Sequence, residues 1–140
     1  MASLTLVGRV LVSGEGAGAA LVSTEPLSFW GGYDHRTGEI IDRRHPLSGQ
    51  VAAGRVLAVP FTRGSSTTTA VLLEAVRAGT APAAILTTGD DTFLALASVV
   101  ADEMYGRPIP VVALDPADFA RLKTGDALRV MPDGRVLTDP

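Results

Sequence analysis

The sequence predicts a mixed α/β domain built in layers, because strand-like runs come first, strands and helices then alternate, and a hairpin closes the chain. Three patterns support this fold class. Two β-branched-rich runs flank the glycine cluster at residues 13–18, apolar runs precede amphipathic stretches in the middle, and Pro132-Asp133-Gly134 joins two final runs. With 140 residues, the chain can build one hydrophobic core but not two independent ones, so residues 1–140 are expected to form a single domain.

The first part of the chain is expected to hold two strands and a long irregular segment. Residues 6–12 and 19–23 are the strands, with the glycine cluster as a wide turn between them. The cluster does not open a helix, because a second strand and then Pro26 follow it, and this argues against a dinucleotide-binding loop. Residues 25–50 keep neither the period of a strand nor that of a helix, which is typical of a functional loop.

The aromatic residues of this irregular segment allow two interpretations. Either Phe29 and Trp30 pin a surface loop into the core, or the loop packs against a partner or lines a pocket. Aromatic side chains carry much of the binding energy at protein interfaces. We expect Phe29, Trp30 and the Gly31-Gly32 turn to lie at a partner interface or at the mouth of a pocket.

The second part of the chain alternates strands and helices. A strand at residues 55–59 is stopped by Pro60, and the helix that follows carries its apolar positions on one face. Gly79 stands where a helix C-cap belongs, and Asp90 or Asp91 is expected to cap a second helix. The other predicted elements are strands at residues 82–87, 109–114, 125–130 and 135–137, a helix at about 92–104 and a helical turn at 116–122.

Composition restricts the classes of function. Hydrophobic residues make up 46% of the chain and charged residues 19%, against about 25% charged in typical proteins. A low charged fraction is expected when a partner covers part of the surface, although a small alanine-rich domain can show it as well. The net charge of −3 and the lack of a basic cluster argue against nucleic-acid binding.

The sequence indicates neither a membrane segment nor a thiolate metal site. The longest apolar runs, residues 81–86 and 93–101, are shorter than the roughly 20 residues that span a bilayer. Residues 1–6 lack the basic start of a signal peptide, so we expect a soluble, cytoplasmic protein. The chain has no cysteine, which excludes disulfides and thiolate ligation of a metal cluster by this chain.

The strongest chemical signal is the run Arg63-Gly64-Ser65-Ser66-Thr67 at the junction of a strand and a helix. A helix N-terminus presents unpaired N–H groups and the positive end of the helix dipole, so it attracts carboxylates and phosphates. Gly64 lets this backbone approach a ligand, and Arg63 adds a planar guanidinium that matches an oxyanion. The run therefore predicts an anion site. In the alternative interpretation, Ser65 or Ser66 is only a helix N-cap and Arg63 is solvated.

Other candidate residues carry weaker signals. Gly64-Ser65-Ser66 lacks the second glycine of the G-x-S-x-G nucleophile motif. His35 and His45 match no zinc-binding spacing, and His45-Pro46 most simply belongs to a turn. Asp90-Asp91 could hold a metal ion, but Asp is a preferred residue at the helix N-cap, so a helix cap is the simpler explanation of the pair.

Several short motifs, taken together, resemble the swivelling-domain subunit of aconitase X. Their order and spacing hold from about Gly8 to Leu114, so most of the chain is covered, and the combination is specific although each motif alone is weak. The motifs are Glu25-Pro26-Leu27-Ser28-Phe29-Trp30-Gly31-Gly32, Asp34 with Thr37-Gly38 and Asp42, His45-Pro46-Leu47, Arg63-Gly64-Ser65-Ser66 and Ala81-Pro82-Ala83-Ala84-Ile85.

The resemblance implies an aconitase-type swivelling β/β/α domain that packs on a large subunit, which carries an iron-sulfur cluster. Family members are hydro-lyases that act on cis-3-hydroxy-L-proline or phosphomevalonate. This chain is thus implied to be the small subunit of a two-chain dehydratase, inactive alone and without metal ligands of its own. In the wider aconitase superfamily, a serine of this loop removes a proton from the substrate carbon. By position that base is Ser65, with Arg63, Gly64, Ser66 and Thr67 in contact with a small anionic substrate.

The loop departs from the pattern Gly-Arg-Gly-Ser-Ser-Ser-Gly that is frequent in the family, because Thr62 precedes Arg63 and Thr67-Thr68 follow the serine pair. These changes leave the serine in place but alter its surroundings, so the choice of hydroxy acid stays open. Two other functions fit the same fold. A non-catalytic module would hold an anion through the Arg63 loop. A phosphohistidine carrier would need an exposed histidine on a helix-capping loop, whereas His35 and His45 both fall in the irregular segment.

Overall fold

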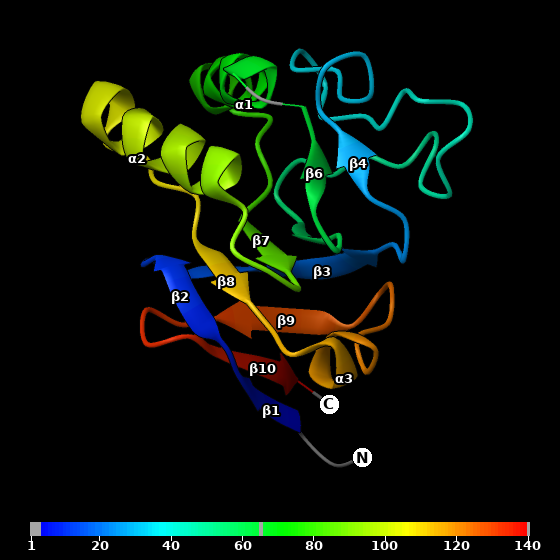
Figure 1. Ribbon diagram of the computed structural model, residues 1–140, viewed down its shortest axis with the longest axis vertical. Coiled ribbons are helices and arrows are strands. Elements are labelled where there is room, and N and C mark those ends of the chain that lie inside the picture. The colour runs from blue at the N-terminus through cyan, green and yellow to red at the C-terminus, as the bar shows by residue number, and fades with distance from the viewer. Residues whose placement is uncertain (1–3, 65, 140) are drawn as a thin grey trace.

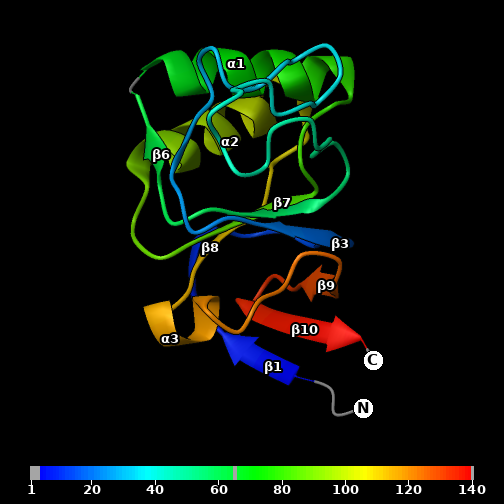
Figure 2. The ribbon, with the colours of Figure 1, turned by 90° about the vertical axis from the view of Figure 1, so that its right-hand side faces the viewer.

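The computed structural model describes residues 4–64 and 66–139 and arranges them in two layers of strands and one layer of helices (Figure 1, Figure 2). The helical layer holds α1 (Ser66–Ala78) and α2 (Thr92–Tyr105), and the short α3 (Pro116–Phe119) lies at the opposite end of the molecule. Two short strands, β4 (Leu27–Ser28) and β6 (Thr62–Arg63), pair in parallel. The main sheet contains β1 (Leu4–Val7), β2 (Arg9–Val12), β3 (Gly16–Val22), β5 (Val56–Ala58), β7 (Ala84–Thr87), β8 (Val111–Ala113), β9 (Ala127–Val130) and β10 (Arg135–Asp139).

The main sheet closes into a barrel-like wall at Gly8. Its strand order is β1-β10-β9-β3-β5-β7-β8-β2, so β1 and β2 stand at the two ends of the order although only Gly8 separates them in the chain. The N–H of Gly8 donates to the carbonyl oxygen of Gly134 at 3.0 Å, and a Cβ atom at Gly8 would collide with Val112. The prediction of one strand over residues 6–12 is therefore wrong, because the chain bends at Gly8 and enters two different parts of the sheet.

Strand β3 belongs to both strand layers, and this explains the glycines at its start. Residues 16–19 pair antiparallel with β9, whereas residues 20–22 pair in parallel with β5. A Cβ atom at Gly18 would lie 2.5 Å from the carbonyl oxygen of Gly54, so only glycine lets the backbones approach here. The predicted wide turn is thus too long, since the strand already begins at Gly16.

The middle layer, which contains the parallel strands β5 and β7, lies between the two long helices and the second layer of strands, and it is apolar on both faces. In β5, Leu57 packs toward the helices, whereas Val56 and Ala58 face the interior of the barrel-like wall, and β7 repeats this alternation. Parallel strands that are covered on both faces consist of uninterrupted apolar runs. This is why the sequence predicts strands at residues 55–59 and 82–87, and the structure confirms both.

The predicted helices and the closing hairpin are confirmed. α1 buries the predicted apolar stripe, and Gly79 follows its last residue with a left-handed φ of 78°. α2 begins after Asp91, whose Oδ1 accepts a 3.1 Å hydrogen bond from the N–H of Leu94. The two helices pack against each other and cover the middle layer (Figure 2), and β9 pairs antiparallel with β10. Within the described residues, no helix is long and apolar enough to span a bilayer.

The segment at residues 25–50 is largely irregular, as predicted, and its two adjacent aromatic residues lie in different environments. Phe29 is fully buried and packs on Tyr33 with 5.0 Å between the ring centroids, whereas Trp30 is 66% exposed. Leu27 and Phe29 share the inward side because side chains alternate along an extended chain. The expectation that Phe29 lies at an interface or a pocket mouth is therefore wrong, and for Trp30 it stays a prediction.

Candidate functional site

The junction between β6 and α1 holds the residues of the predicted anion site. β6 ends at Arg63, Gly64 follows with a φ of 109°, and α1 begins at Ser66. Other L-residues are strained at such a positive φ, so the backbone here requires glycine. Thr67 follows in the first turn of α1. The predicted base, Ser65, lies outside the described residues.

The first turn of α1 offers polar groups that no described residue uses. The turn contains no acidic side chain. A Cβ atom at Gly64 would lie 3.2 Å from Oγ1 of Thr67 and 3.5 Å from Oγ1 of Thr68, so both hydroxyls lie beside the loop. Thr68 is fully buried, and its Oγ1 has no hydrogen-bond partner among the described residues. Buried hydroxyls are normally paired, so this end of the helix suits a polar or anionic ligand.

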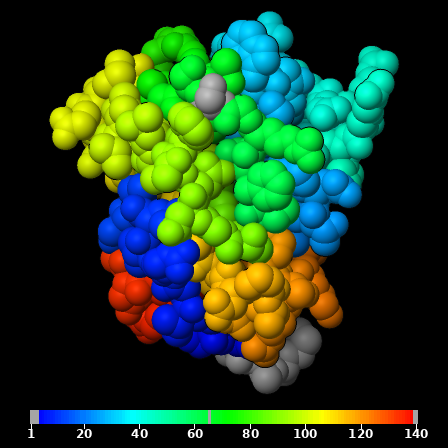
Figure 3. Space-filling model, viewed as in Figure 1, coloured from blue at the N-terminus to red at the C-terminus, as the bar shows by residue number. Residues whose placement is uncertain are grey.

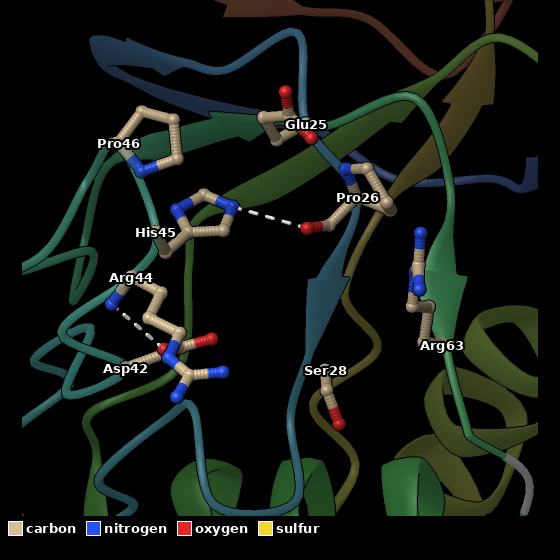
Figure 4. A pocket seen from close by; sticks show the side chains of 8 residues that line it. All are labelled: Glu25, Pro26, Ser28, Asp42, Arg44, His45, Pro46 and Arg63. Carbon is tan, nitrogen blue, oxygen red and sulfur yellow. Dashed lines mark hydrogen bonds between the residues drawn. The ribbon is translucent and has the colours of Figure 1, made fainter.

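A cavity of about 430 Å³ opens beside Arg63, between β6 and the irregular segment (Figure 4). Arg63 lines it from β6, Ser28 from the adjacent β4, and Arg44 from the loop on the opposite side. No carboxylate in residues 4–64 or 66–139 forms an ion pair with either arginine. The lining residues are Glu25, Pro26, Ser28, Asp42, Arg44, His45, Pro46 and Arg63. With two guanidinium groups and two carboxylates, the cavity suits a small ligand that carries both charges.

His45 holds one wall of this cavity in place. Its Nδ1 accepts a 3.1 Å hydrogen bond from the N–H of Leu47, so the proton of the neutral ring lies on Nε2. Nε2 donates to the carbonyl oxygen of Pro26, also at 3.1 Å, and the residue is only 8% exposed. Both ring nitrogens thus take part in hydrogen bonds that hold this loop against Pro26. The interpretation of His45-Pro46 as part of a turn is confirmed.

The acidic and histidine residues of the described ranges give no metal site. No three His, Cys, Asp or Glu side chains within these ranges are arranged to hold a metal ion. Asp90 forms an ion pair with Arg9, whereas Asp91 caps α2, which confirms the cap interpretation at Asp91. Thiolates ligate iron-sulfur clusters, so a chain without cysteine does not fit such a cluster.

The sequence singles out Arg63 as a ligand-binding residue, whereas for the opposite wall it indicates only that the irregular segment could line a pocket, which the structure confirms. Arg63 stands in a motif with a clear chemical meaning, whereas Glu25, Ser28, Asp42 and Arg44 come from a segment without periodicity. The parallel pairing of β4 with β6 places Ser28 opposite Arg63, and two-residue strands leave no periodic signal in a sequence. Glu25, Ser28 and Asp42 also stand in the motifs that resemble aconitase X, but those motifs do not indicate a cavity.

Two strand layers, a helical layer and a strand-glycine-helix junction beside a charged cavity define a swivelling β/β/α domain. The chain belongs to the aconitase X swivel domain family, whose model matches residues 5–138. This membership confirms the fold that the motif resemblance implies.

Named relatives and a solved structure agree with this membership. The chain is 50% identical over 109 residues to cis-3-hydroxy-L-proline dehydratase from Pseudomonas aeruginosa, covering 78% of this chain and 19% of that protein. It is 43% identical over 101 residues to the phosphomevalonate dehydratase small subunit from Methanothermobacter thermautotrophicus, covering 71% of this chain and 77% of that subunit. A crystal structure of Thermococcus kodakaraensis aconitase X in its holo-form superimposes with a TM-score of 0.86 at 34% identity, covering 98% of this chain and 99% of that one.

Proposed function

We propose that this chain is the small subunit of an aconitase X type dehydratase and works only together with a larger chain. Two length relationships support the proposal. The chain spans 19% of the cis-3-hydroxy-L-proline dehydratases from Pseudomonas aeruginosa and Hypocrea jecorina that it matches, so most of such an enzyme has no counterpart here. It spans 77% of a relative that is itself called a small subunit. The name of that small subunit implies a larger partner, and we propose that a second chain supplies the rest of the enzyme.

The observation that carries the proposal is the position of Arg63 and Gly64, between the N-terminal end of α1 and the charged cavity. In the proposed reaction, the alkoxide Oγ of Ser65 takes a proton from the substrate carbon, and the neighbouring hydroxyl departs with its bonding electrons, which leaves a carbon–carbon double bond. The departing hydroxide and the abstracted proton together make up the water that is released. A serine is a weak base at its ordinary pKa, so its alkoxide needs a positive field. The start of α1 and the guanidinium of Arg63 supply that field. The N–H groups and hydroxyls of Ser66 and Thr67 are assigned to the substrate anion.

The cofactor of the proposed enzyme is an iron-sulfur cluster on the larger chain. This chain has no cysteine, and its described residues offer no alternative set of metal ligands. The proposed division of labour leaves the substrate-facing base and anion contacts with this chain. The cluster and its ligands lie outside it.

The mixed charge of the cavity favours cis-3-hydroxy-L-proline as the substrate. This imino acid carries a carboxylate and a ring ammonium group. Arg44 and Arg63 suit the carboxylate, and Glu25 and Asp42 suit the ammonium group. Phosphomevalonate carries a phosphate and a carboxylate but no cation, so it would leave two carboxylates of the cavity without a partner.

The test compares the chain alone, the larger aconitase X chain of the same organism alone, and the two together. Each preparation is analysed for iron and assayed for dehydration of cis-3-hydroxy-L-proline and of phosphomevalonate. We expect stoichiometric iron only where the larger chain is present, and turnover of cis-3-hydroxy-L-proline only in the mixture. Iron retained by the chain alone would overturn the cofactor assignment. A stable complex that binds the substrate without turnover would support the non-catalytic anion-binding module instead.

A further inference from the structure

The carboxylate of Asp91 connects β6, the strand that leads to the junction with α1, to the start of α2. Oδ2 of Asp91 accepts hydrogen bonds from the backbone N–H of Thr62 at 2.8 Å and from its Oγ1 at 2.6 Å. Oδ1 of the same carboxylate accepts from the N–H of Leu94, as the cap of α2. Asp91 thus satisfies three donors from two elements, and a helix cap alone would need only one of these bonds.

A second contact fixes the same stretch of chain two residues earlier. The N–H and Oγ1 of Thr88 both donate to the carbonyl oxygen of Pro60, each at 3.1 Å. Residues 60–62 are therefore held by residues 88–91, and Figure 3 shows these segments side by side on the face that carries the junction. On its other edge, β6 pairs with β4 through Thr62 and Arg63. Every one of these contacts precedes Gly64, so they determine how the chain enters the junction.

We propose that Asp91 is a positioning residue, which acts through Thr62 to set where Arg63 and Gly64 stand relative to the cavity and to α1. This inference rests on the proposed dehydratase function for its catalytic consequence. A shift of about 1 Å in a positioned group can cost about 100-fold in rate, so a reactive loop benefits from a rigid anchor. A carboxylate suits the role because it accepts several hydrogen bonds at once and carries the charge that strengthens them.

The test uses small substitutions in the assembled enzyme, which separate the role of Asp91 as the cap of α2 from its hydrogen bonds to Thr62. In Asp91→Asn, one oxygen still caps α2, but the amide N–H₂ cannot accept from the N–H of Thr62. Thr62→Val removes only the hydroxyl bond, and Thr62→Ser restores it. Asp90→Asn is the matched control, because the adjacent Asp90 pairs with the side chain of Arg9 and has no hydrogen bond to β6 within the described residues.

We expect Asp91→Asn and Thr62→Val to lower kcat at saturating substrate by about 10-fold or more, while Thr62→Ser and Asp90→Asn stay within about twofold of the wild type. In the chain alone, the NMR signal of the Gly64 amide should move in Asp91→Asn and stay in place in Asp90→Asn. A normal kcat with an unmoved Gly64 signal in Asp91→Asn would overturn the inference. If the wild-type complex shows no turnover, the proposed function fails, and the Gly64 signal alone then decides whether Asp91 positions the junction.

Discussion

The hydroxyl of Tyr33 donates a 2.7 Å hydrogen bond to the carbonyl oxygen of Thr80, just beyond the C-terminal end of α1. In return, Oγ1 of Thr80 donates to the carbonyl oxygen of His35 at 2.5 Å. These bonds attach the irregular segment to one end of α1, while the other end of the helix carries the predicted anion site. Two hydrogen bonds thus tie the irregular segment, which also contains Arg44, to the chain just after α1.

The buried phenol of Tyr33 predicts a loss of stability at alkaline pH. Burial raises the pKa of Tyr33 above its usual value of about 10, so the folded chain keeps a proton that the unfolded chain releases. The contribution of this phenol to the free energy of unfolding is therefore fully present below about pH 10 and is lost as the pH rises from there through the raised pKa of Tyr33. Tyr33→Phe should cost about 1 kcal/mol at pH 7 through loss of the hydrogen bond to Thr80.

Denaturant unfolding of both proteins between pH 7 and pH 11 measures this effect. We expect the stability gap between the wild type and Tyr33→Phe to shrink as the pH passes 10, because only the wild type carries the buried phenol. A gap that stays constant up to pH 11 would contradict the raised pKa. Tyr105→Phe serves as the control for removing the chain's second phenol.

The exposed indole of Trp30 is predicted to contact the larger chain. It is the only tryptophan of the sequence, and it directly follows the fully buried Phe29 while its own side chain is 66% exposed. Aromatic anchors of this kind carry much of the energy at interfaces, and Trp30→Ala should weaken assembly at least about fivefold in Kd. Val7→Ala, at an exposed apolar residue of β1, is the control.

A fluorine label on Trp30 reports the contact directly. In the chain grown with 5-fluorotryptophan, a single ¹⁹F signal is expected, because Trp30 is the only tryptophan. Addition of the larger chain should shift that signal. An unchanged signal in a complex that forms normally would place Trp30 outside the interface.

Elements stabilised by local patterns could be predicted from the sequence. α1 shows its buried stripe and Gly79, α2 shows its cap, and the closing hairpin shows a turn between two short strands. Closure of the sheet could not be predicted, because it depends on Gly8 meeting Gly134 across 126 positions of the sequence. A glycine between two apolar runs does not indicate which distant strands its neighbours will join.

The same distinction applies to the candidate site. Arg63 and Gly64 belong to a local motif with a known chemical meaning, so the sequence indicates an anion site there. Arg44 lines the cavity from a loop that His45 joins to Pro26, and one histidine before a proline does not specify that contact. Phe29 and Trp30 are adjacent in the motif, and only the pairing of β4 with β6 decides which of them is buried.

Arg63 and Arg44 are predicted to bind the substrate carboxylate. Because each would contribute a charge-assisted hydrogen bond, Arg63→Ala and Arg44→Ala should each raise KM about 10-fold to 100-fold, with a smaller change in kcat for Arg44→Ala. Arg43→Ala is the matched control, since Arg43 is the exposed neighbour of Arg44 and does not line the cavity. Equal KM values for Arg44→Ala and Arg43→Ala would remove Arg44 from the substrate site.

Ser65 is predicted to be the proton-abstracting base of the assembled enzyme. If so, Ser65→Ala should lower kcat by about 10²-fold or more and leave assembly intact, because general bases contribute about 10² to 10⁴ in rate. Ser66→Ala, at the exposed first residue of α1, should keep most of kcat. A helix N-cap at Ser65 would instead cost about 1 kcal/mol of stability and leave kcat almost unchanged. Turnover and thermal unfolding of both variants, measured in the complex with the larger chain, separate the two roles, and wild-type turnover in Ser65→Ala would end the assignment.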